Sequence, residues 1–133
     1  MKTLPLRVLA PERTFFDGAC TSLTVPSIDG MYGLMAQHED IVLAIVPGKL
    51  TLRDADGVEQ IAAVSEGVLK MEHGEALVLV DTIERPEEID WKRAEAAKER
   101  AEERLRQKLS IQEYYNSKAA LARAVARLKA ARK

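Results

Sequence analysis

Short alternations of apolar and polar residues fill the first two thirds of the chain. Leu4, Leu6 and Val8 repeat at every second position, and residues 41–46 form a continuous apolar run. Both patterns are typical of strands that bury one or both faces. Turn signals recur roughly every eight to twelve residues, the spacing expected of a sandwich or barrel; they are Asp17-Gly18, Asp29-Gly30, Pro47-Gly48, Asp56-Gly57, Glu66-Gly67 and His73-Gly74.

The apolar period changes after Glu84, and no glycine follows Gly74. Pro86 suits the first turn of a helix, and Ser110 with Glu113 forms a capping-box pattern that starts a second helix. Apolar residues recur at helical spacing in both segments: Trp91, Ala94, Ala97, Ala101 and Leu105, then Tyr114, Leu121, Val125 and Leu128. We therefore predict an α+β chain, with an antiparallel β-sandwich over residues 1–84 and a two-helix hairpin over residues 85–133.

Alanine dominates the apolar stripe of the first predicted helix. Burial stabilises by about 25 cal/mol per Å² of apolar surface, so small side chains give only modest docking energy. We expect that the two helices can detach from each other or from the sandwich and rearrange.

Charge divides the chain in the same place as the apolar pattern. Residues 1–83 carry 6 Lys and Arg against 12 Asp and Glu, whereas residues 84–133 carry 14 against 9. Such an asymmetry indicates that the two segments face different partners. The chain has a single cysteine, Cys20, which is consistent with a reducing compartment, and we expect it to be a small buried residue of a strand. We also expect no signal peptide and no membrane-spanning segment.

Five segments together resemble the epsilon subunit of F-type ATP synthases: residues 11–18, 25–30, 45–50, 81–85 and 89–94. The resemblance implies a non-catalytic rotor-stalk subunit whose sandwich binds the gamma subunit and the c-ring. It implies that the hairpin folds on the sandwich or extends to the alpha and beta subunits and blocks ATP hydrolysis. Membrane association would then come only through the complex, and without a transit peptide we expect the cytoplasmic face of a bacterial plasma membrane.

The resemblance also implies a regulatory ATP site, although no cofactor is required. Guanidinium groups suit phosphate oxygens, and Arg123 and Arg127 lie one helical turn apart, close enough to converge on one anion. The alternative to a nucleotide site is a solvated helix in which Asp90 and Arg93 form a local ion pair. The positions that match the family's nucleotide site are Glu84, Ile89, Asp90, Arg93, Ala94, Arg100, Arg123 and Arg127.

A loop after the second predicted turn is expected, by the resemblance, to contact the c-ring. Its candidate residues are Asp29, Gly30, Met31, Tyr32, Gly33 and His38. The family usually carries Pro-Gly before this histidine, whereas this chain has Ala36-Gln37.

Two other functions, nucleic-acid binding and hydrolysis, have to be considered from the residues alone. Residues 118–133 hold six Lys and Arg and no acid, which is typical of nucleic-acid-binding or membrane-surface helices. The acidic sandwich and scarce aromatic residues argue against nucleic acid. A small hydrolase is disfavoured because no nucleophile and base converge, and His38 and His73 have no partner at metal-ligand spacing.

Overall fold

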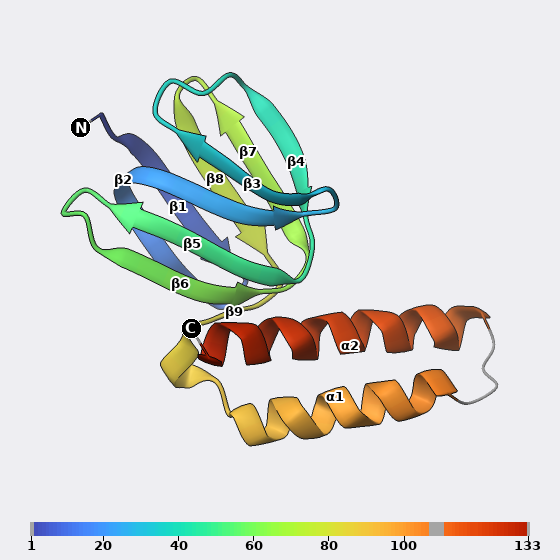
Figure 1. Cartoon of the computed structure of the whole chain (residues 1–133). Coiled ribbons are helices and arrows are strands. Elements are labelled where there is room, and N and C mark those ends of the chain that lie inside the picture. The colour runs from blue at the N-terminus through green and yellow to red at the C-terminus, as the bar shows by residue number, and fades with distance from the viewer. Residues whose placement is uncertain (1, 107–110, 133) are drawn as a thin grey trace.

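The computed structural model describes residues 2–106 and 111–132, and these form a strand-rich body followed by two helices (Figure 1). The described elements are β1 (Leu4–Ala10), β2 (Arg13–Ser27), β3 (Gly30–Met35), β4 (Ile41–Ile45), β5 (Gly48–Asp54), β6 (Glu59–Val64), β7 (Gly67–Glu72), β8 (Glu75–Val80), β9 (Ile83–Glu84), the 3-10 turn η1 (Pro86–Glu88), α1 (Trp91–Arg106) and α2 (Ile111–Arg132).

Strand β2 joins the two layers of the sandwich. Its first half pairs with β1 in the layer ordered β4-β7-β8-β1, and its second half pairs with β3 and β5 in the layer that continues to β6 and β9. The predicted sandwich is confirmed. Its pairings are antiparallel except that of β1 with β8, which is parallel.

The core between the layers comes from the alternating residues of the strands. Leu4, Leu6 and Val8 are at most 1% exposed, and the residues between them face solvent. Cys20 is also buried, which raises the pKa of its thiol to about 11 and agrees with a packing role rather than a reactive one. Every residue of this core cluster lies between Leu4 and Ile83. The sandwich therefore needs no helix to complete its core.

One predicted turn is wrong. Asp17 and Gly18 lie inside β2, where they pair with Arg7 and Leu6 of β1. The Phe16 ring lies 3.6 Å from the position that a Cβ on Gly18 would take, an ordinary contact distance, so packing does not require glycine at this strand position.

The turn predicted at Asp56-Gly57 does connect β5 to β6. Gly57 adopts a positive φ of 81°, and the Asp54 carboxylate accepts hydrogen bonds from the backbone N–H groups of Asp56 and Val58 at 2.9 and 3.0 Å. Local turn chemistry therefore fixes this hairpin.

The first α-helix begins later than predicted. Pro86 starts the short turn η1, and α1 begins only at Trp91, where the Asp90 carboxylate accepts a hydrogen bond from the Arg93 backbone N–H at 3.2 Å. Trp91 was expected on the buried stripe, but its side chain is 58% exposed, whereas Ala94 and Ala101 are buried. The predicted cap at Ser110 lies outside the described residues.

Helix α2 lies between the sandwich and α1 (Figure 1). Its contact with the sandwich is built from small side chains, since Ala130 clusters with Ala63 of β6 and Ile89, with Ala131 packed beside them. Ala126 faces the same strand. The two predicted helices thus pack together, and α2 is the helix of the pair that packs on β5 and β6.

Gly67 offers a sharp test of packing between the sandwich strands. A Cβ at this position would collide with the Leu79 carbonyl oxygen and lie 2.8 Å from the Val80 Cα, whereas a Cβ on Gly33 would meet its nearest atom at an ordinary 3.7 Å. We predict that Gly67→Ala lowers the free energy of unfolding by about 1–3 kcal/mol, as overpacked sites do. Gly33→Ala should change it by less than half as much, and equal effects in urea unfolding would contradict this packing.

Candidate functional site

A groove opens between the helical hairpin on one side and, on the other, β9 with the linker that follows it (residues 85–90). Its volume is about 400 Å³, within the range of small-molecule sites. Both acidic and basic side chains line it, and the lining residues are Glu84, Glu88, Asp90, Arg93, Ala94, Ala97, Arg100 and Arg127. The structure therefore brings six of the eight predicted nucleotide-site residues to one groove.

Arg127 enters this groove from α2 and is already paired. Its Nε donates to a carboxylate oxygen of Glu84 at 2.6 Å, and both side chains are about one-third exposed. Charge-assisted contacts of this length are the stronger kind of hydrogen bond. Arg127 therefore presents only part of its guanidinium to an anion in the groove.

Arg123 and Ile89 do not line the groove. Arg123 donates to Glu66 at 3.3 Å, on the turn between β6 and β7, while Ile89 is buried beside Ala63 and Ala130. The two arginines that were expected to converge on one anion are each held by a different carboxylate in this conformation.

Asp90 and Arg93 also differ from the simple ion pair considered above. The Asp90 carboxylate accepts from the Arg93 backbone rather than from its guanidinium. Capping by Asp90 fixes the first turn of α1, and both side chains line the groove. Asp90 and Arg93, which match the family's nucleotide site, therefore have a structural role as well as a candidate binding role.

The sequence reading missed Glu88. This carboxylate accepts from the Arg85 backbone N–H at 2.7 Å and from Arg13 Nη1 at 3.0 Å, and these contacts lower the pKa of Glu88 below its ordinary value. Pro86 two residues earlier was a signal for a tight turn, but nothing in the sequence pointed to a partner 75 residues away.

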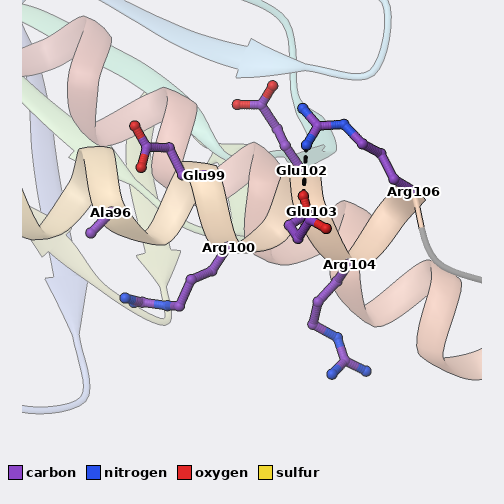
Figure 2. Close-up of a pocket in the computed structure, with 7 residues that line it drawn as sticks. All are labelled: Ala96, Glu99, Arg100, Glu102, Glu103, Arg104 and Arg106. Carbon is purple, nitrogen blue, oxygen red and sulfur yellow. Dashed lines mark hydrogen bonds and ion pairs between the residues drawn. The ribbon is translucent and has the colours of Figure 1, made fainter.

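The outer face of α1 is a solvated mixture of charges. Figure 2 shows Arg100 and Arg104 pointing to one side of the helix, and Glu99 and Glu102 to the other. Arg106 pairs with Glu103 at 2.8 Å within the same helix. Apart from Arg100, which also lines the groove, these side chains lie on open surface rather than in a built site.

The predicted c-ring loop is mostly strand. Gly30, Met31, Tyr32 and Gly33 belong to β3, paired with β2, and Asp29 lies in the turn that precedes it. Strand alternation turns Leu34 inward and Met31 outward. The exposed apolar residues here are Ile28, Met31 and Met35, at 84%, 57% and 57%.

His38 closes this region through two hydrogen bonds. Its Nε2 lies 2.9 Å from the Tyr32 hydroxyl, and its Nδ1 lies 2.7 Å from the Glu39 carbonyl oxygen. Gln37 before it has a φ of 68°, a conformation that glycine adopts more readily. The turn therefore keeps a glycine-like backbone although Ala36-Gln37 replaces Pro-Gly.

Within residues 2–106 and 111–132, no three His, Cys, Asp or Glu side chains are grouped to hold a metal ion. Among the same residues, no helix combines the length and hydropathy needed to cross a membrane.

Comparison with known proteins covers nearly the whole chain. Residues 3–86 match the family described as "ATP synthase, Delta/Epsilon chain, beta-sandwich domain", and residues 87–132 match the corresponding "long alpha-helix domain". The ATP synthase epsilon chain of Ruminiclostridium cellulolyticum is 48% identical over 130 residues, covering 98% of this chain and 96% of that relative. The epsilon chain of Caldicellulosiruptor bescii is 47% identical over 131 residues, covering 98% and 95%.

Solved structures share the fold. A chain of the Euglena gracilis mitochondrial ATP synthase superposes with a TM-score of 0.85 at 21% identity, covering 98% of this chain and 82% of that one. A chain of the Tetrahymena thermophila mitochondrial ATP synthase, in a structure of its central stalk and c-ring, gives 0.68 at 16% identity, covering 98% and 97%. The two matched domains, and the 47–48% identity to epsilon chains over nearly the full length, show that this chain belongs to the ATP synthase delta/epsilon family. It is an epsilon chain, a non-catalytic subunit of that enzyme.

Proposed function

We propose that this chain is a central-stalk subunit whose sandwich couples the rotating c-ring to the gamma subunit, and whose helical hairpin restrains ATP hydrolysis. In the restraining state the hairpin reaches the alpha and beta subunits. The subunit works at the cytoplasmic face of a bacterial plasma membrane and meets the membrane only through the complex.

The observation that carries the proposal is the separation of the sandwich core from the hairpin. The core cluster uses no helix residue, and α2 docks through Ala126, Ala130 and two partly exposed ion pairs. Exposed ion pairs contribute about 0–1 kcal/mol each. The hairpin can therefore leave at low cost while the sandwich stays folded on its partners.

The positive charge of α2 also supports a hairpin that binds the catalytic subunits. Arg123 and Arg127 of α2 face Glu66 and Glu84 of the sandwich in the docked state. Acidic protein surface is thus what these two residues already bind, and we propose the same chemistry for their targets on the catalytic subunits. Nucleic acid is not needed to explain the basic charge.

The exposed apolar end of the sandwich fits a protein interface. Met31 and Met35 belong to β3, which lies on the side of the sandwich away from the helices (Figure 1), and Ile28 lies in the turn before it. Exposed apolar patches commonly mark binding surfaces. We assign this end, with Asp29, Tyr32 and His38, to the c-ring.

We further propose that the groove binds ATP as a regulatory ligand. Arg93, Arg100 and Arg127 supply donors for phosphate oxygens, and Glu84 and Asp90 supply acceptors for the base or ribose. The lining comes from the linker, α1 and α2, so a ligand there holds the docked conformation together.

Removal of residues 91–133 tests the restraining role. We predict that this truncation leaves assembly of the ATP synthase intact and raises its ATP hydrolysis several-fold, because the arm that blocks the head is missing. Hydrolysis and subunit composition are measured on purified complexes. Unchanged hydrolysis in a fully assembled complex would count against restraint by the hairpin.

Substitution of Arg100 tests the nucleotide site. Arg100→Gln should weaken ATP binding to the isolated chain about tenfold or more, since one charge-assisted hydrogen bond contributes about 1.5–3 kcal/mol. Arg106→Gln is the matched control, because Arg106 pairs with Glu103 outside the groove. Calorimetric titration that shows no ATP binding, or equal loss in both variants, would rule out this site.

A further inference from the structure

Four side chains fasten the linker to the sandwich, and we name them the linker anchor: Arg13, Phe15, Arg85 and Glu88. Arg13 Nη1 lies 3.0 and 3.1 Å from the two carboxylate oxygens of Glu88 and also donates to the Ile83 carbonyl oxygen at 3.4 Å. The Arg85 guanidinium lies 4.2 Å from the centroid of the Phe15 ring. Strand β2 therefore holds the linker at two points.

The linker is also closed on itself. The Arg85 backbone N–H donates to Glu88 at 2.7 Å, and the Glu88 backbone N–H donates back to the Arg85 carbonyl oxygen at 3.0 Å. Just before it, β9 pairs with β6 through Ile83 and Glu84. Ile83, Glu84, Arg85 and Glu88 are thus each tied to the sandwich or to one another.

The contacts change character immediately afterwards. Ile89 packs between Ala63 of the sandwich and Ala130 of α2, and Asp90 turns its carboxylate to the first turn of α1. From Trp91 onward, α1 packs on α2 and not on the sandwich (Figure 1). Two bodies meet at this point, and the contact between them combines small side chains with the ion pairs Arg123–Glu66 and Arg127–Glu84.

We propose that the linker anchor makes residues 85–88 part of the sandwich, so that the hairpin swings about Ile89 and Asp90, and that Glu88 is the positioning residue of this pivot. Hinges are commonly a few residues at the end of an element that absorb the backbone change. The pivot lies inside the helical domain as the sequence families divide it, two residues beyond that boundary.

The pivot divides the groove. Glu84 and Glu88 stay with the sandwich when the hairpin leaves, whereas Asp90, Arg93 and Arg127 move away with the helices. Glu88 therefore fixes the stationary wall, and it sets where the moving wall returns. No ligand and no partner subunit is needed for this division, so the pivot can be tested independently of the ATP and restraint proposals.

The test uses the full chain with the hairpin undocked. Ala126 is 3% exposed and faces Ala63 and Val64, so Ala126→Glu places a charge in that contact and releases α2. Because the core cluster contains no helix residue, the sandwich remains folded. Amide hydrogen exchange is then read residue by residue by NMR.

We expect the amides of α1 and α2 to exchange faster in Ala126→Glu, while those of Arg85 and Glu88 keep the rates of the parent chain. In the same background, Glu88→Gln should accelerate Arg85 and Glu88 amide exchange about three- to tenfold. The matched control is Glu87→Gln, one residue away, which has no ion pair among the described residues and should change neither rate.

A double variant separates positioning from general destabilisation. Arg13→Gln should also accelerate exchange at Glu88, and its combination with Glu88→Gln should give less than the sum of the two effects, because both variants weaken the Arg13–Glu88 contact. Additive effects, or Arg85 and Glu88 amides that open together with the helices in Ala126→Glu, would overturn the proposed pivot.

Discussion

The contact between α2 and the sandwich sets what the rest of the molecule can do. Alanine side chains bring the helix close to β6 but bury little area, and burial is the main source of docking energy. The sandwich, in contrast, fills its own core with leucine, valine and isoleucine. Two bodies of unequal stability are therefore joined by a contact that can open without unfolding either layer of strands.

Ion pairs give this weak contact its register. Arg123 meets Glu66 and Arg127 meets Glu84, so α2 docks at one position along β6 rather than sliding on a smooth alanine surface. The acidic first part of the chain and the basic last part thus attract each other in the docked state. Such pairs are screened by salt and exchangeable, which suits an arm that binds different acidic surfaces in turn.

Much of the fold followed from the sequence because the strands alternate cleanly. Leu4, Leu6 and Val8 face the core as predicted, and the Asp56-Gly57 turn forms where local chemistry demands it. The turn predicted at Asp17-Gly18 was wrong, since the sequence alone does not distinguish a glycine inside a strand from a glycine in a turn. The parallel pairing of β1 with β8 joins segments about 70 residues apart, and periodicity carries no information on such partners.

The candidate site was predictable only through the family resemblance. It pointed to Arg100 and Arg127, which line the groove, but gave no sign that Arg123 turns to Glu66 instead. Glu88 went unnoticed because its partner Arg13 lies at the far end of the sequence. Contacts between charged residues of this kind depend on tertiary geometry, which short sequence patterns do not encode.

Amide hydrogen exchange of the unmodified, isolated chain tests the central claim most directly. The account predicts that residues 91–106 and 111–132 exchange markedly faster than the central strands β1, β2 and β8, because the hairpin opens without the sandwich. Equal protection of helices and strands would show a single rigid body and would contradict it.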